Sequence, residues 1–532
     1  MIIKFAIIWY NALISHIDMS DNTQNNKRIA KNTVVLYLRM IVIMAVNFYT
    51  SRVILEALGV VDYGIYTVVG GVVAMFGIIS NSLSTSTQRF ITFGIGKNDP
   101  KNLRTIFSTS VYIHLGMSIL IFILAETIGL WFLYNEMQIP ADRFNAALWV
   151  YQCTIASSII LIMSVPYNAT IIAHEKMNVF AYISLLEVFV KLGSVYVLFL
   201  VSTDKLIIYA ILMFMTQLCI SGCYALYSRL HYKETKLHLV KDKKLLKEIW
   251  SFSSWSLFGN AAYISYTQGL NILLNVFFNP AVNAARGIAV QVQSAINHFV
   301  VSFHTAINPQ ITKSYAAGNL NYMQKLVFKS AKFSYFMLLI LTLPIILEAN
   351  IILSVWLTTV PEHTVVFLRL ILITTLINAI ANPMIVSVKA TGKIKQYETT
   401  VGVIMLMILP VSYIFLKLGY PPHTVFVVHI CTECVAQAFR VWITKRLIGF
   451  SIKEFINSVL LKITATTGVA IIAPVLCYLA LDKGGILPFV ATCSVSLLSC
   501  LTATFFLGLT HNERKMITGK LSVVFKKIGI KS

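Results

Sequence analysis

Charged side chains inside apolar segments are the residues of this 532-residue chain whose types and spacing could do chemistry. Arg39 and Lys191 lie well inside such segments, and Glu187 precedes Lys191 by four residues, so Glu187 and Lys191 can pair on one helical face. Arg286 opens a longer stripe, because positions separated by 7, 11 or 18 residues share a helix face. This stripe consists of Arg286, Gln293, Asn297, His304 and Asn308. Cationic groups that are partly withdrawn from water bind phosphate or carboxylate, so the pattern predicts a site for an anion.

Two more polar stripes correspond to each other at an offset of 221 residues. Asn32, Arg39 and Thr50 share one face of the first apolar segment, and the seventh segment repeats the pattern with Ser253, Asn260, Thr267 and Asn271. Polar residues in a bilayer face protein or water, so these faces could line a hydrated cavity. The alternative is that they bond neighbouring helices. Glu187–Lys191 could likewise be a structural pair, and Arg52 and Arg286 could extend to the outer membrane interface.

The composition predicts that helices spanning a membrane carry these side chains. Mean hydropathy is +0.76, with 57% hydrophobic and 12% charged residues, whereas soluble domains have about 25% charged residues. Of the 43 Lys and Arg residues, 34 fall in one set of alternating loops and terminal segments, and seven fall in the other set. Basic loops stay cytoplasmic, so both termini are expected to be cytoplasmic. The same rule explains the net charge of +22 without a nucleic-acid partner.

Fourteen spans of about 20 apolar residues are expected, and together they predict an all-α polytopic membrane protein. They are 30–52, 63–86, 105–134, 143–165, 177–201, 205–228, 249–278, 282–308, 326–356, 365–388, 397–417, 423–444, 458–481 and 485–508. The predicted organisation is a cytoplasmic segment 1–28, a six-helix bundle 29–230, a basic cytoplasmic linker 231–248, a second six-helix bundle 249–447, two further helices in 448–510 and a basic cytoplasmic tail 511–532. Met19, which opens a polar stretch, is an alternative start.

The two bundles contain blocks that match in the same order. Gln88 to Gly96 resembles Gln310 to Gly318 at an offset of 222, and Pro166 with Lys176 resembles Pro383 with Lys393 at an offset of 217. Six spans separate each block from its match, so the halves have the same orientation in the membrane. Parallel repeats of this kind are typical of transporters, whose binding sites lie between the halves near the midplane.

Enzyme motifs are absent from the sequence. It contains no G-x-x-x-x-G-K-[ST] phosphate loop, no H-E-x-x-H zinc motif and no G-x-S-x-G nucleophile motif. We therefore expect no ATP hydrolysis, no resident metal or cofactor, and no enzymatic activity.

Two segments resemble the polysaccharide transporter family of the multidrug/oligosaccharidyl-lipid/polysaccharide flippase superfamily. They are Arg28-Ile-Ala-Lys-Asn-Thr33 and the run from Ser51 to Tyr66, which includes an expected elbow at 59–64; Ser84 to Phe90 and Ala173 to Lys176 fit the same pattern. The resemblance implies two parallel six-helix repeats of MATE-like fold plus two C-terminal helices. It also implies a flippase of the bacterial inner membrane that moves undecaprenyl-pyrophosphate-linked oligosaccharide, a repeat unit of O-antigen, capsule or exopolysaccharide, outward by alternating access.

Family members hold the pyrophosphate with basic residues on the cavity wall, and coupling to a proton or sodium gradient is proposed for them. The resemblance and the polar stripes together give the expected cavity residues Arg39, Arg52, Arg286, Lys191, Asn260, Gln293 and Asn297. Glu187, Arg89 and His304 are the expected coupling or gating residues. The expected partners are the lipid-linked substrate, membrane lipids and polysaccharide polymerase or assembly proteins, with the chain itself a monomer. The alternative function is a drug or cation antiporter of the same superfamily.

Overall fold

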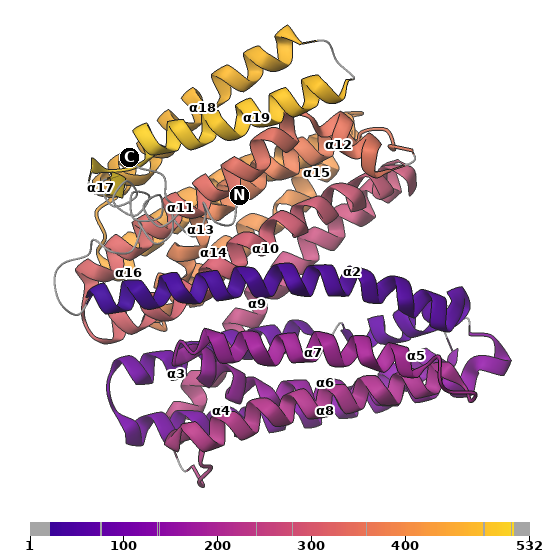
Figure 1. Ribbon diagram of the computed structural model, residues 1–532. Helices are drawn as coiled ribbons and strands as arrows, with labels where there is room; N and C mark the ends of the chain where they lie inside the picture. Colours follow the sequence, from indigo (N-terminus) through magenta and orange to yellow (C-terminus); the bar gives the residue numbers. More distant parts are fainter. Residues whose placement is uncertain are drawn as a thin grey trace, which may run out of the picture. The chain divides into compact units, whose positions relative to one another are not determined.

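The computed structural model describes residues 22–514, apart from 75–76, 136, 138, 241, 279, 358, 482–484 and 512. Helices account for nearly all of this part of the chain, and it contains no β-strand (Figure 1). The proposed alternative start at Met19 and most of the basic tail lie outside the described residues. The chain divides into two compact units, one formed by Val35–Asn260 and the other by the described residues before Val35 and after Asn260.

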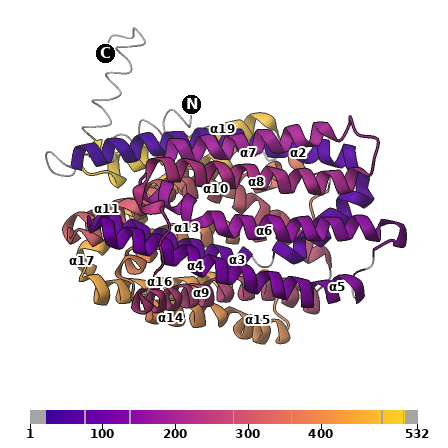
Figure 2. The same cartoon turned by 90° about the horizontal axis from the view of Figure 1, so that it is seen from below.

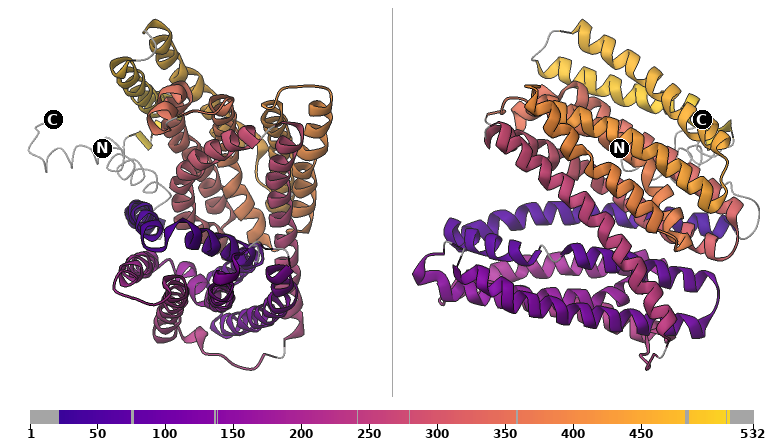
Figure 3. Two further views of the ribbon diagram at one scale, coloured as in Figure 1. Left: turned by 90° about the vertical axis from the view of Figure 1, so that its right-hand side faces the viewer. Right: turned by 180° about the vertical axis from the view of Figure 1, so that it is seen from behind.

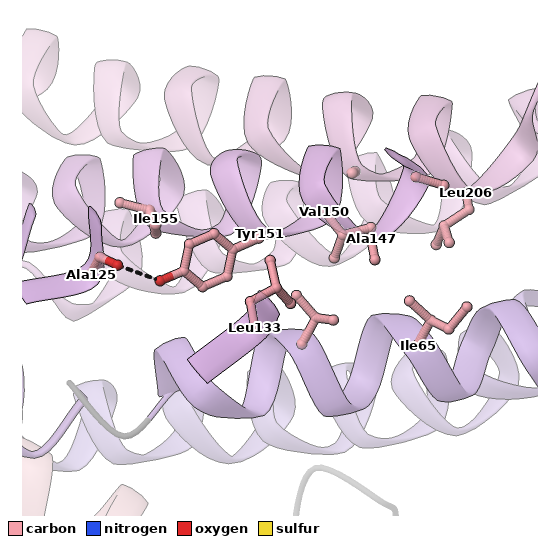
Figure 4. Close-up of a cluster of buried hydrophobic side chains, with 11 residues drawn as sticks. Ile65, Ala125, Leu133, Ala147, Val150, Tyr151, Ile155 and Leu206 are labelled. Carbon is pink, nitrogen blue, oxygen red and sulfur yellow. Dashed lines mark hydrogen bonds between the residues drawn. The ribbon is translucent and has the colours of Figure 1, made fainter. Parts of the chain in front are cut away.

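In the Val35–Asn260 unit, α6 is the central helix and packs against α3, α4, α7 and α8 (Figure 2). The elements are α2 (Asn22–Ala74, from Val35 onward), α3 (Gly77–Gly96), α4 (Pro100–Leu124), η1 (Ala125–Gly129), α5 (Leu130–Asn135), η2 (Ala141–Arg143), α6 (Phe144–Ala173), α7 (Met177–Val197), α8 (Lys205–His231), η3 (Lys233–Thr235) and the first half of α9 (Lys243–Phe277). A buried cluster fixes α6 to the end of α4: Tyr151 is fully buried and donates a 2.7 Å hydrogen bond to the carbonyl of Ala125, beside Leu133 and Val150 (Figure 4).

In the second unit, α13 is central and packs against α10, α11 and α16. The elements, besides the end of α9, are α10 (Pro280–Ala316), α11 (Leu320–Leu347), α12 (Ala349–Trp356), α13 (Thr364–Thr391), α14 (Lys395–Leu406), α15 (Ile408–Lys417), α16 (Thr424–Ile448), α17 (Ile452–Phe455), η4 (Ile456–Leu460), α18 (Leu461–Ala480), α19 (Ile486–Ala503) and η5 (Thr504–Gly508). The C-terminal helices α18 and α19 pair with each other and lie against α11 (Figure 3).

A backbone kink at Gly59 divides α2. Gly59 has φ 78° and ψ 170°, a conformation that essentially only glycine adopts. It lies at the first residue of the elbow expected between the first two spans. The elbow is therefore confirmed as a sharp change of direction within a nearly continuous helix.

A similar local geometry follows the first matched block and ends the second. Asn98 and Gly318 both have positive φ, at 56° and 76°. Asp99 and Asn319 then cap the next helix, because each side chain accepts a hydrogen bond from the backbone N–H three residues on. Both pairs are offset by 220 residues, two fewer than the offset of 222 that aligns the blocks, and the repeat layout stays a prediction.

Eleven of the described helices are long and apolar enough to cross a membrane. The predicted spans 63–86, 249–278 and 282–308 form helices, in α2–α3, α9 and α10, but these are not among the eleven. The spans 249–278 and 282–308 carry the polar faces noted in the sequence, whereas the span 63–86 runs across residues 75–76, which lie outside the described part of the chain. A helix that neighbours shield from lipid does not need to be apolar all round, so polarity is the physical reason for the difference at the spans 249–278 and 282–308.

Candidate functional site

Arg39 joins α2 to α7, which lies beside it (Figure 1). Its Nε donates a hydrogen bond to Ser184 Oγ, and its guanidinium carbon lies 4.5 Å from the centre of the Phe180 ring. Further along the same face of α7, Lys191 Nζ donates to Glu187 Oε1 at 2.6 Å. The pairing expected from the i, i+4 spacing is confirmed. We call Arg39, Ser184, Glu187 and Lys191 the Arg39 cluster.

The Arg39 cluster has a cationic excess, because two basic groups accompany one carboxylate. Glu187 is close enough to interact electrostatically with Arg39 as well as with Lys191. Arg39 is half-buried, and the Lys191 and Glu187 side chains are 40% and 30% exposed. Such a cluster can attract and bind an anion that reaches α7.

Arg52 does not join this cluster. It lies on α2 thirteen residues after Arg39 and is exposed. At 1.5 Å per residue the two positions are about 20 Å apart along the helix. One small phosphate-containing group therefore cannot bridge both arginines.

Arg89 and Asn260 fasten α9 to α3 within the same unit. Arg89 is buried, with its guanidinium 4.4 Å from the Phe90 ring, 4.7 Å from that of Phe93 and 5.6 Å from that of Phe252 on α9. Asn260 Nδ2 donates to Ser82 Oγ at 2.8 Å. Cation–π contacts of this kind stabilise a buried guanidinium. Arg89 is thus placed to hold the cytoplasmic end expected for α3.

In the second unit, the side chain of Arg286 contacts α9. It donates to Asn271 Oδ1 and, at 3.0 Å, to the carbonyl of Thr267. These two partners belong to the polar stripe of the seventh predicted span, so the seventh and eighth stripes meet here. Arg286 is buried, and its Nε has no hydrogen-bond partner among the described residues. A buried, incompletely bonded guanidinium has remaining capacity to bind an anion.

Other residues of the α10 stripe contact different neighbouring helices. Gln293 Nε2 donates to Thr375 Oγ1 on α13 at 2.8 Å, and His304 Nε2 lies 2.8 Å from Ser334 Oγ on α11. Asn297 is half-buried between these positions on the same helix. Gln293 and His304 thus bond neighbouring helices, which was the alternative interpretation of the stripe. The structure does not gather the predicted α10 residues around one point.

A buried network on α16 was missed by the sequence analysis. Arg440 pairs with Glu433, donates to Gln437 Oε1 at 3.2 Å, and donates from Nε to Tyr397 Oη at 3.2 Å. The Glu433 side chain has no exposed surface, and its Oε2 has no partner among the described residues. Glu433 and Arg440 are seven residues apart, so the spacing rule applied to α10 could have found them.

Lys332 and Glu513 form a second buried ion pair, at 2.9 Å, which ties α11 to the residues after η5. Thr510 and Glu513 each accept a hydrogen bond from the other's backbone N–H, which is a capping box. Burial alone would raise the pKa of the Glu513 carboxyl, but the Lys332 ammonium holds it below its usual value. The Thr-x-x-Glu spacing was the available sequence signal.

The predicted linker is bonded to the ends of α4 and α6. Glu234 Oε1 lies 2.6 Å from His174 Nε2, and His238 Nδ1 lies 3.0 Å from Ser108 Oγ. Burial favours the neutral Glu234 carboxyl, but the hydrogen bond with His174 lowers its pKa below the usual value. Among the described residues, no group of three His, Cys, Asp or Glu side chains could hold a metal ion.

No protein-family model and no curated protein matches the chain. Solved structures do match. A multidrug resistance MATE family transporter of the MOP superfamily, in an outward-facing conformation, is 14% identical with a TM-score of 0.68, covering 79% of this chain and 96% of that one. A MATE structure in the bent conformation is 13% identical with a TM-score of 0.69, covering 81% and 98%. A MOP superfamily transporter from Pyrococcus furiosus, described as having a binding pocket of reverse polarity that suggests a different function, is 14% identical with a TM-score of 0.63, covering 79% and 96%.

These likenesses define the class. The chain is an all-helical, multi-pass membrane protein with the fold of the MATE transporters. Nearly the whole length of each of these MATE chains is matched, while about a fifth of this chain is not covered by the match.

Proposed function

We propose that this chain is a MOP superfamily transporter that flips undecaprenyl-pyrophosphate-linked oligosaccharide across the bacterial inner membrane by alternating access. The substrate would be a repeat unit of O-antigen, capsule or exopolysaccharide. The observation that carries the proposal is the Arg39 cluster, a half-buried cationic group on helices otherwise suited to lipid.

The charge of the substrate explains why such a cluster is needed. A pyrophosphate that enters a low-dielectric region loses hydration, at a cost of several kcal/mol per ion. Within the Val35–Asn260 unit, Arg39 and Lys191 could compensate that loss with charge-assisted hydrogen bonds. Within the second unit, Arg286 could do the same. The transporter would not be an enzyme in this proposal, because it breaks no bond of the substrate.

The second candidate is a drug or cation antiporter. It is favoured by the likeness to multidrug MATE transporters and by the buried Glu433 carboxylate, which could attract a cation. The Pyrococcus furiosus neighbour is relevant here, since its pocket polarity is described as reversed and as suggesting a different function. The charge of the candidate binding site is therefore the property that we use to choose between the candidates, and the net positive Arg39 cluster favours an anion.

Several finer features belong to the same proposal. They are fourteen spans in two parallel six-helix repeats with two added helices, both termini in the cytoplasm, proton or sodium coupling, and cooperation with polysaccharide polymerase or assembly proteins. Arg52, Asn260, Gln293 and Asn297 would contribute to the wall of the substrate path, and Arg89, Glu187 and His304 to gating or coupling.

The test uses a deletion strain complemented with the intact chain or with single variants. We expect the deletion to accumulate undecaprenyl-linked oligosaccharide, measured by mass spectrometry of extracted lipids, and to lose surface glycan. Arg39→Ala and Arg286→Ala should fail to restore the glycan at normal protein levels. Arg446→Ala, which removes an exposed guanidinium on α16, is the matched control and should restore it.

Two outcomes would overturn the proposal. One is normal surface glycan with both Arg39→Ala and Arg286→Ala. The other is a deletion strain that accumulates no lipid-linked sugar but becomes sensitive to cationic drugs, which would establish the antiporter instead.

A further inference from the structure

The ion pairs in the described helices differ sharply in accessibility. Side chains of the Arg440–Glu433 pair are 6% and 0% exposed, whereas those of Lys191 and Glu187 are 40% and 30% exposed. Closed pairs of the first kind are costly to separate, because each leaves an unpaired buried charge. A pair that water reaches is held weakly and can exchange partners. The Lys191–Glu187 pair is therefore suited to be opened by a competing anion.

Glu187 stands between the two cations of the Arg39 cluster. On α7 it follows Ser184, the partner of Arg39, by three residues and precedes Lys191 by four, so all three positions share one helix face. The other titratable groups that face it are Arg39 from α2 and Tyr224 from α8. With Glu187 ionised, the cluster has a net charge of only one positive unit.

We propose that Glu187 is the resident counter-ion of the Arg39 cluster and that an entering pyrophosphate must displace it from Lys191. This inference rests on the proposed function and assigns Glu187 as a specificity-determining residue. A ligand with a single negative charge gains little, because it only replaces the attraction that Glu187 already provides. A pyrophosphate diester has two negative charges, so it can engage Lys191 and Arg39 together and outcompete the carboxylate.

Glu187 would thereby make the cluster selective for pyrophosphate over monophosphate. Selectivity of this kind arises from a built-in competitor as much as from attractive contacts. Removing the carboxylate charge should strengthen the binding of both anions and reduce the preference for pyrophosphate over phosphate. If the Glu187–Lys191 pair were purely structural, breaking it should weaken the binding of both anions.

The experiment measures binding of inorganic pyrophosphate and inorganic phosphate to the full-length protein in lipid nanodiscs, by isothermal titration calorimetry. The pH is slightly acidic, so that phosphate is mainly a monoanion and pyrophosphate mainly a dianion. Wild type should prefer pyrophosphate. Glu187→Gln should bind phosphate about tenfold more tightly than wild type does, and its preference for pyrophosphate over phosphate should be smaller. Glu187→Asp, with a shorter reach toward Lys191, should give a gain of about threefold. Thermal unfolding of each variant checks that it is folded.

Glu126→Gln is the matched control, because Glu126 accepts from Gln152 at 3.3 Å in the same unit, and it should behave as wild type. The inference is overturned if folded Glu187→Gln and Glu187→Asp bind both anions as wild type does while Lys191→Met abolishes binding; the proposed function would then survive. If folded wild type binds neither anion, the proposed function fails, and the inference fails with it.

Discussion

Glu513 shows how one residue can serve two stabilising roles. Its backbone and side chain complete a capping box with Thr510, and its carboxylate pairs with Lys332 at 2.9 Å in a site where both side chains are about 5% exposed or less. A buried ammonium deprived of its partner would remain desolvated and unpaired. The stability of the second unit should therefore depend strongly on this ion pair.

We expect Glu513→Gln to destabilise this unit by about 3–5 kcal/mol at neutral pH. The lowered pKa of Glu513 gives the sign of the pH dependence: the contribution is complete above the usual value of 4.5 and is lost as pH falls through the lowered value. Thermal unfolding midpoints should be measured against pH. The difference in midpoint between variant and wild type should decrease as the pH becomes acidic.

Glu454→Gln provides the control for this measurement. Ser451 and Glu454 have the same Ser/Thr-x-x-Glu spacing, and Ser451 Oγ accepts a hydrogen bond from the backbone N–H of Glu454. The Glu454 side chain, however, is exposed. The change should alter stability by less than about 0.5 kcal/mol. Equal effects of the two substitutions would show that the ion pair contributes nothing beyond the cap.

At the scale of elements, the kink of α2 depends on backbone conformation alone. A Cβ placed on Gly59 would meet no atom within 4 Å, so no steric contact opposes a side chain there. Its φ of 78° is the obstacle, since L residues rarely adopt that region.

Gly59→Ala should therefore destabilise the protein or straighten α2, at a cost of about 1–3 kcal/mol. Gly64→Ala tests the same change at a helical glycine that also has open space, and should be neutral or slightly stabilising. The readouts are the unfolding midpoint and surface-glycan complementation. Equal tolerance of both variants would contradict a conformational role for Gly59.

For the whole molecule, the number of spans decides the side on which each end lies. Fourteen spans place both termini on one side, whereas the eleven helices that meet the length and hydropathy criteria would place them on opposite sides. The difference is the predicted spans 63–86, 249–278 and 282–308. The polar faces of α9 and α10 lower the hydropathy of the last two, and the first runs across residues 75–76, which lie outside the described part of the chain.

We expect all three to span the membrane, with both ends cytoplasmic as the basic loops indicate. Green fluorescent protein fused to each terminus should then fluoresce, and alkaline phosphatase fused to either terminus should be inactive. An active C-terminal phosphatase fusion would favour an odd number of spans.

Local features were predictable from the sequence because they depend on residues a few positions apart. The Glu187–Lys191 pair follows from i, i+4 spacing. The elbow at Gly59 was expected from the family resemblance of residues 51–66. The membrane class follows from composition and from the alternation of basic loops.

The partners of each polar face were decided only by the tertiary structure. Helical periodicity indicates that Arg286, Gln293 and His304 share a face, but not that they bond α9, α13 and α11 respectively. Nor does it bring Arg39 to Ser184, 145 residues away. A helix presents the same stripe whichever neighbour it meets. The identity of that neighbour depends on how all the helices pack, because burial of apolar surface is non-directional and specifies no partner.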